Sequence, residues 1–160
     1  MEEQEKKFLT PEQAISKLEY YCSYQDRCHT EVINKLYLLG ISPSQHDSIL
    51  VHLIQENFLN EERFAKSYAR GKHRMSGWGK NRIISDLNYK KISPYLIKKA
   101  MEELPDELYF ETFNRISSQK WNSTKAKSLA SKKEKVITYL YRKGYESEYI
   151  FDKIKELERE

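Results

Sequence analysis

Apolar residues recur along most of the chain at intervals of three and four, the spacing that places side chains on one face of a helix. The first such face follows Thr10 and Pro11 and consists of Ala14, Ile15, Leu18, Tyr21 and Cys22. Similar faces follow Pro43 and Pro94, and the second of these ends before Pro105. Alternation of apolar and polar residues, the mark of a half-buried strand, is nowhere convincing over four residues or more. The pattern therefore predicts an all-α protein.

A junction between helices occurs three times, at offsets of 51 and 53 residues. Its copies are Leu36…Gly40-Ile41-Ser42-Pro43, Leu87…Lys91-Ile92-Ser93-Pro94 and Leu140…Gly144-Tyr145-Glu146-Ser147. Glycine readily adopts the left-handed conformation that ends a helix, and serine followed by proline is favoured where the next helix begins. Lys91 takes the place of the glycine in the second copy, so we expect a strained or differently closed turn there. The recurrence predicts three related units.

Each unit is expected to hold three helices, over residues 10–58, 59–105 and 106–160, after an N-terminal tail over residues 1–9. The helices are short, so their stability must come from packing their apolar faces. Units in tandem contact mainly their neighbours, which predicts an elongated, curved array of three-helix repeats.

The composition favours a folded protein of the cytoplasm. The chain has 160 residues, of which 39% are apolar and 32% charged, so it can bury a core and is not typical of disorder. The first residues lack the apolar stretch of a secretory signal, and no run approaches the roughly 18 apolar residues of a membrane span. Cys22 and Cys28 have no metal or redox spacing, and we expect them to stay reduced and unpaired.

Positive charge is concentrated in the middle of the chain. The net charge is +4, but residues 61–99 carry eleven Lys or Arg against three acidic residues. Such a concentration is typical of a surface that faces phosphates or an acidic protein. A solvated helix face is the alternative interpretation.

The helix expected after Asn60 separates its residues into two faces. Phe64, Ala65, Tyr68, Ala69 and Met75 are predicted to lie on one side. The opposite side carries Arg63, Lys66, Arg70 and Arg74. Four cations in line repel one another unless something negative lies opposite, so we interpret this side as a binding face.

The segment Gly77-Trp78-Gly79-Lys80-Asn81-Arg82 joins that helix to the next. It resembles a phosphate cradle at a helix N-terminus, where backbone amides and the helix dipole favour anions. It is no nucleotide-binding fingerprint, because it lacks the third glycine and follows a helix instead of a strand. Trp78 either stacks on a base or fills a gap between units, and packing is the better interpretation of the tryptophan alone.

Enzymatic chemistry is not predicted. His29, His46, His52 and His73 lack metal-ligand spacing with cysteine or carboxylate, and no hydrolase or metalloprotease motif occurs. We expect no catalytic site, no cofactor and no metal.

Three stretches in the expected order resemble motifs of the RecX family. They are Glu31-Val32-Ile33-Asn34-Lys35-Leu36 with Gly40-Ile41, Leu59-Asn60-Glu61-Glu62-Arg63-Phe64-Ala65 with Tyr68 and Arg70, and Gly77-Trp78-Gly79 with Arg82-Ile83 and Leu87. Cys28 departs from the family, which commonly has a capping hydroxyl there. The last third matches only from Val136 to Gly144.

The resemblance implies tandem three-helix units that bind along the groove of a RecA–DNA filament, act in recombination, DNA repair and the SOS response, and usually suppress filament growth, ATP turnover and strand exchange. It implies that Arg63, Arg70, Lys80 and Arg82 contact the filament, whereas Phe64, Ala65, Ile83 and Leu87 are structural. With the charge pattern, the candidate binding residues are Arg63, Lys66, Arg70, Lys72, Arg74, Trp78, Lys80, Arg82, Lys90 and Lys91.

We expect a monomer whose partner is the RecA filament, with weaker, non-specific binding to single- and double-stranded DNA and none to membranes. One alternative is a helix-turn-helix-like DNA-binding module without a recombinase partner, because paired helices joined by short turns also describe that class. An inert helical scaffold is the other.

Overall fold

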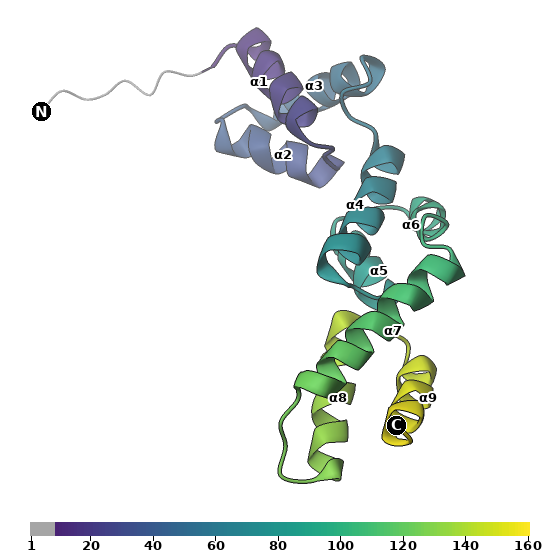
Figure 1. Ribbon diagram of the computed structural model, residues 1–160. Coiled ribbons are helices and arrows are strands. Elements are labelled where there is room, and N and C mark those ends of the chain that lie inside the picture. Colours follow the sequence, from purple (N-terminus) through teal and green to yellow (C-terminus); the bar gives the residue numbers. More distant parts are fainter. Residues whose placement is uncertain (1–8) are drawn as a thin grey trace, which may run out of the picture. The chain divides into compact units, whose positions relative to one another are not determined.

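The structure is a computed structural model that describes residues 9–160, and the tail expected at residues 1–9 lies outside the described residues except for Leu9. Nine α-helices and no strand occur in the described part (Figure 1). The helices are α1 (Pro11–Tyr24), α2 (His29–Leu38), α3 (Pro43–Gln55), α4 (Glu61–Ser76), α5 (Lys80–Tyr89), α6 (Pro94–Met101), α7 (Asp106–Ser123), α8 (Leu129–Lys143) and α9 (Ser147–Glu158). The all-α prediction is confirmed. None of the helices within residues 9–160 is long and apolar enough to cross a membrane.

Side chains cap several of the helices. Thr10 and Gln13 form a reciprocal capping box at the start of α1, and the Ser93 hydroxyl accepts a hydrogen bond from the Leu96 amide at the start of α6. Ser42 makes no such bond, because its hydroxyl lies 3.0 Å from that of Ser44. Cys28 precedes α2 without a side-chain capping bond. Serine before proline therefore marks the start of both α3 and α6. Only at α6 does the serine side chain cap the helix.

The three junctions close through residues with positive φ. Gly40 and Gly144 have φ values of +72° and +97°, and Lys91 has a φ value of +60°. The strained turn expected at Lys91 is therefore present. Residues other than glycine are uncommon in this conformation because their Cβ atom crowds the backbone. The second junction therefore carries a backbone strain of about 1–2 kcal/mol that glycine would avoid.

The described chain divides into two compact units, residues 9–64 and residues 65–160. In the first unit α1 and α2 both pack on α3. Its core consists of Ala14, Leu18, Cys22, Val32, Leu36, Ile41, Ile49, Leu53 and Leu59. Neither cysteine forms a disulfide among the described residues, and both are buried.

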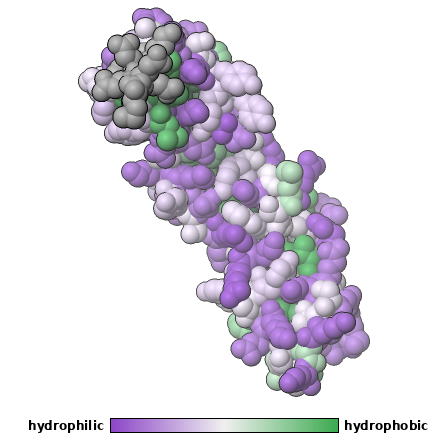
Figure 2. Space-filling model, turned by 90° about the vertical axis from the view of Figure 1, so that its left-hand side faces the viewer, coloured by the Kyte–Doolittle hydropathy of each residue, from purple (hydrophilic) through white to green (hydrophobic). Residues whose placement is uncertain are grey.

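The second unit contains α5 to α9 and most of α4, and aromatic rings fill part of its core. Tyr109 and Tyr145 are almost fully buried. The ring of Tyr145 lies 4.8 Å from that of Phe113 and 5.5 Å from that of Tyr109. Helix α7 packs against both α8 and α9. The face shown in Figure 2 is mostly hydrophilic, with hydrophobic residues in small separate groups.

Candidate functional site

The turn that begins α5 is bound by backbone hydrogen bonds to the turn that ends α8. These bonds run from the Gly79 amide to the Lys143 carbonyl at 2.7 Å and from the Asn81 amide to the Gly144 carbonyl at 2.9 Å. The Lys80 amide between them donates to the Tyr109 hydroxyl at 3.0 Å. The amides expected to cradle a phosphate are therefore paired with protein oxygens. The phosphate-cradle interpretation of this segment is wrong, because α8 and α7 supply acceptors that the local sequence does not reveal.

Close approach explains the glycines on both sides of this joint. A Cβ atom on Gly79 would lie 2.5 Å from the Gly144 carbonyl, and a Cβ atom on Gly144 would lie 2.4 Å from Cβ of Arg82. Gly79 has a φ value of −80°, which any residue can adopt. At Gly79 it is therefore contact between the two turns, and not backbone conformation, that requires glycine.

Buried side chains fix the same joint from inside. The Tyr145 hydroxyl donates to the Gly77 carbonyl, and His73 Nδ1 lies 2.8 Å from the Trp78 carbonyl oxygen. A carbonyl can only accept, so His73 Nδ1 carries the hydrogen. Burial, with a smaller effect of the neighbouring Glu146 carboxylate, raises the pKa of Tyr145 well above its usual value. Its hydroxyl therefore remains a donor at neutral pH.

A groove of about 550 Å³ lies beside this joint, within the second unit. It is lined by Trp78, Asn81, Arg82, Ser85, Asp86, Tyr89, Tyr141, Arg142, Gly144 and Tyr145, and we call this surface the α5–α8 groove. Tyr89 is 85% exposed and Tyr141 is 65% exposed. One wall of the groove is thus the outer face of α5 and the other is the end of α8.

Trp78 serves as a platform for cations at the edge of the groove. The Arg82 guanidinium carbon lies 4.0 Å from the centre of the indole ring, and Lys72 Nζ lies 4.8 Å from it. Arg82 also donates to the Arg142 carbonyl at 3.2 Å. Cation–π contacts stabilise such an arrangement by about 0.5–2 kcal/mol each. The structure therefore assigns Trp78 a positioning role toward Arg82.

The charge of the α5–α8 groove is positive. Two arginines line it against a single carboxylate, Asp86, which accepts a hydrogen bond from the Tyr68 hydroxyl. Lys72 and Lys90 lie over the ring of Tyr68 nearby, at 5.4 and 5.7 Å from its centre. Cations can neutralise phosphates, and the exposed aromatic rings beside them can stack on bases.

Other predicted residues lie apart from this groove. Arg70 and Arg74 line a second hollow together with Glu103 and Glu111, and Arg70 pairs with Glu103 at 3.1 Å. Lys66 is partly buried on α4, and Lys91 is exposed at the strained turn. Lys80 Nζ lies 4.7 Å from the centre of the Tyr109 ring, within the joint. The structure thus brings Lys72, Trp78, Arg82 and Lys90 together and places the rest elsewhere.

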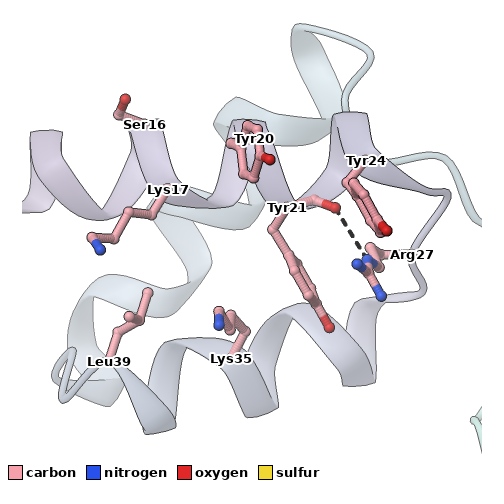
Figure 3. A pocket seen from close by; sticks show the side chains of 8 residues that line it. All are labelled: Ser16, Lys17, Tyr20, Tyr21, Tyr24, Arg27, Lys35 and Leu39. Atoms are coloured by element: carbon pink, nitrogen blue, oxygen red, sulfur yellow. Dashed lines mark hydrogen bonds between the residues drawn. The ribbon is translucent and has the colours of Figure 1, made fainter.

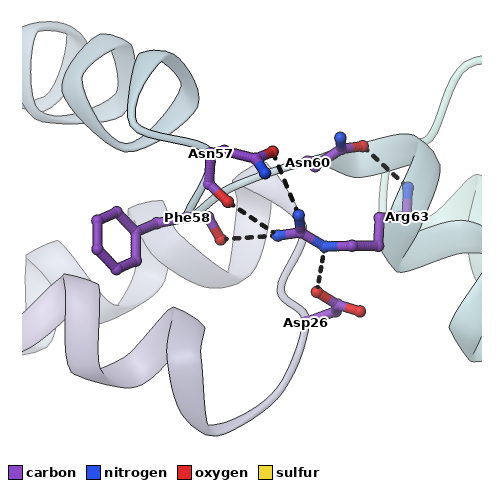
Figure 4. Close-up of polar contacts among 5 residues, drawn as sticks. All are labelled: Asp26, Asn57, Phe58, Asn60 and Arg63. Carbon is purple, nitrogen blue, oxygen red and sulfur yellow. Dashed lines mark hydrogen bonds and ion pairs between the residues drawn. The ribbon is translucent and has the colours of Figure 1, made fainter.

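Arg63 belongs to the first unit and connects three segments of it (Figure 4). Its Nε donates to Asp26 at 2.7 Å, and its terminal nitrogens donate to the Asn57 side chain and to the carbonyls of Asn57 and Phe58. Four of its five N–H donors are used in this way. These contacts favour a structural role for Arg63 over the binding role that the resemblance implies.

The buried face of α4 is largely as predicted. Phe64, Ala65 and Ala69 are buried, as are Ile83 and Leu87 on α5. Met75, expected on the same face, is 86% exposed. Helical spacing still places Met75 on this side of α4, but the buried part of that side ends before this residue.

The groove contains residues that the sequence did not single out, namely Tyr89, Tyr141 and Arg142. The last two belong to the third copy of the junction motif, and nothing in the linear sequence shows that this copy packs against Gly79. Among the described residues no group of three or more His, Cys, Asp or Glu is placed to hold a metal ion.

Family models match two parts of the chain. Residues 60–101 match the second three-helix domain of RecX, and residues 106–154 match the third. Together the two matches cover more than half of the chain.

Curated relatives called Regulatory protein RecX are similar over most of the chain. The Vibrio parahaemolyticus protein is 29% identical over 80% of this chain and 81% of its own length. The Lactobacillus johnsonii protein is also 29% identical over 80% of this chain but matches over 47% of its own length, and the Bacillus cereus protein is 28% identical over 99% of this chain and 56% of its own. The chain thus spans about half the length of these longer relatives.

The fold is also that of solved structures. The crystal structure of RecX from Lactobacillus salivarius superposes with a TM-score of 0.78 at 27% identity, over 94% of this chain and 97% of that one. A second crystal structure, of regulatory protein RecX, has a TM-score of 0.81 at 23% identity and shows the fold alone. With the matches to the family models, these findings show that the chain belongs to the RecX family.

Proposed function

We propose that this protein is a non-enzymatic regulator that inhibits the RecA recombinase. It binds in the groove of the RecA–DNA filament and limits filament extension, ATP hydrolysis and strand exchange. The proposal is supported by membership of a family whose relatives are called Regulatory protein RecX. The names of these relatives state no mechanism, so the mechanism rests on the chemistry of the surface.

The α5–α8 groove is the observation that carries the proposal. It combines Arg82 and Arg142 with the exposed rings of Tyr89 and Tyr141. The DNA of such a filament presents phosphates, and an acidic protein surface would present carboxylates. Arginine binds either group in a bidentate manner, and exposed rings add contact area at a low cost in side-chain entropy. The site therefore fits a polyanionic partner without requiring a defined base sequence.

Inhibition follows from occupation of the filament groove. A protein that lies there blocks the path of an incoming DNA duplex, and at a filament end it blocks the next recombinase subunit. Addition at an end is affected by few bound molecules, so inhibition is expected at less than one molecule per recombinase subunit. Cytoplasmic location and a monomeric state belong to the same proposal.

The test is the single-stranded DNA-dependent ATPase of the recombinase from the same organism. Wild-type protein should slow ATP hydrolysis, whereas the double variant Arg142→Glu/Tyr89→Ala should need about tenfold more protein for the same effect. The matched control is Lys98→Glu/Tyr95→Ala, because both side chains are exposed on α6 and line neither surface described above. The control should inhibit like the wild type.

Two results would contradict the proposal. ATP hydrolysis unchanged by equimolar wild-type protein would exclude inhibition of the recombinase, and equal inhibition by the groove variant and the control would exclude the groove. A footprint of the protein alone at a defined DNA sequence would instead favour the helix-turn-helix-like alternative.

A further inference from the structure

A third groove, outside the candidate site, lies between α1 and α2 in the first unit (Figure 3). Its volume is about 570 Å³. It is lined by Ser16, Lys17, Tyr20, Tyr21, Tyr24, Arg27, Lys35 and Leu39, and we call it the tyrosine cleft. Three of these residues are aromatic, three are cations and one is aliphatic, so the cleft differs from an ordinary apolar groove.

Two of the tyrosines are strongly exposed. Tyr20 and Tyr24 lie one helical turn apart on α1, and each is 74% exposed. Side chains four residues apart on a helix have Cβ atoms about 5–6 Å apart. The two rings therefore form adjacent flat surfaces at the edge of the cleft, although burying them would be favourable.

The third tyrosine holds cations in place. Tyr21 is half-buried, with the Arg27 guanidinium carbon 3.7 Å and Lys35 Nζ 5.4 Å from the centre of its ring. Arg27 Nε also donates to the Tyr21 carbonyl at 3.1 Å, a bond drawn in Figure 3. Burial against α2 raises the pKa of Tyr21, so its ring stays neutral beside these cations.

Among the described residues that line the cleft none is acidic, whereas Lys17, Arg27 and Lys35 are cations. Two carboxylates lie near the cleft without lining it: Asp26, which Arg63 holds at 2.7 Å, and Glu31, whose charge acts on Tyr21. The surface thus offers positive charge directly beside exposed aromatic faces. Nucleic acid bases stack on such faces while cations contact the phosphates.

We propose that the tyrosine cleft binds a short stretch of single-stranded nucleic acid. Bases stack on Tyr20 and Tyr24, and the phosphates between them contact Lys17 and Arg27. An acidic peptide would use the cations but would leave the two exposed rings without a role, so the rings favour nucleic acid. The proposal goes beyond the regulatory function because it requires no recombinase.

The experiment measures anisotropy of a fluorescein-labelled dT15 oligonucleotide titrated with the full chain at several salt concentrations. The measurements use the Arg142→Glu/Tyr89→Ala protein as the reference, so that the α5–α8 groove contributes little. Adding Tyr20→Ala/Tyr24→Ala should weaken binding at least about fivefold, since each stacked base contributes a measurable part of the affinity. Adding Tyr95→Ala, the same substitution at a tyrosine of α6 that is 66% exposed, should leave binding unchanged.

Lys17→Gln provides a second measurement. Each phosphate contact on a single strand contributes a slope of about −0.7 to the dependence of log affinity on log salt. Lys17→Gln should reduce the steepness by about that amount, and Lys98→Gln should not. Far-UV circular dichroism of every variant should match that of the reference protein.

The proposal is overturned if removing Tyr20 and Tyr24 changes the affinity no more than removing Tyr95. It is also overturned if poly-glutamate displaces dT15 from the cleft at lower concentration than unlabelled dT15 does, because an acidic protein segment is then the better ligand. No recombinase is present, so neither result depends on the outcome of the ATPase experiment.

Discussion

Gly79→Ala tests the joint between the turns before α5 and after α8. The added Cβ atom meets the Gly144 backbone at 2.5 Å, a distance that packed atoms do not tolerate, so the two turns must separate. Overpacking of this kind costs about 1–3 kcal/mol. Separation also weakens two backbone hydrogen bonds, one from Gly79 and one from Asn81, at about 1 kcal/mol each. We expect the free energy of unfolding of the second unit to fall by about 3–5 kcal/mol.

The two tryptophans of the chain make this change measurable in one unit. Trp78 and Trp121 both belong to the second unit, so tryptophan emission during urea unfolding reports on that unit. Gly79→Ala should lower the urea midpoint by about 1 M or more. The control is Gly71→Ala within α4, where a Cβ atom meets nothing within 4 Å. Alanine is the better helix former, so the control should raise stability by about 0.5–1 kcal/mol.

The reasoning would be refuted if Gly79→Ala left the midpoint within error of the wild type. In that case the two turns would not be in the contact described, and the groove beside them would lose its geometric basis.

Three further predictions concern stability. Tyr145→Phe removes the donor to the Gly77 carbonyl and should lower the tryptophan-detected stability by about 1–2 kcal/mol, and an unchanged midpoint would contradict that bond. Arg63→Ala removes the partner of Asp26 and should lower the stability of the first unit by about 1–3 kcal/mol. Amide hydrogen exchange in α1 to α3 should then be about tenfold faster or more, while the folded fraction still inhibits the ATPase. Burial raises the pKa of Cys22 to about 11 from 9.0, so the folded state disfavours the thiolate and stability should be constant below about pH 9 and fall between pH 9 and 11. The fall in stability should be smaller in Cys22→Ala, and an equal fall in both proteins would contradict the raised pKa of Cys22.

Local features of the fold could be predicted from the sequence. The capping box at Thr10, the left-handed turns at Gly40 and Gly144 and the strained turn at Lys91 each depend on residues within about five positions of one another. Apolar spacing likewise predicted the face of α1 that carries Ala14 and Leu18, both of which are fully buried. Such features follow from backbone sterics and helical periodicity, which act over short distances along the chain.

The candidate site could not be predicted in the same way, because its contacts join distant segments. Gly79 was interpreted as part of a phosphate cradle, and only the fold shows Gly144 against it. Arg63 falls on a line of cations by periodicity, but its partner Asp26 comes from a loop that precedes α2. The unit boundaries and the elongated, curved array stay predictions.

The central claim is that the α5–α8 groove touches the recombinase filament. The most direct measurement places the photo-cross-linker p-benzoylphenylalanine at Tyr89 in the groove or at Tyr95 on α6, both strongly exposed. Irradiation with recombinase filaments on single-stranded DNA should join the protein to recombinase or DNA from position 89 and much less from position 95. Equal cross-linking from both positions, or cross-linking from position 95 alone, would contradict the account.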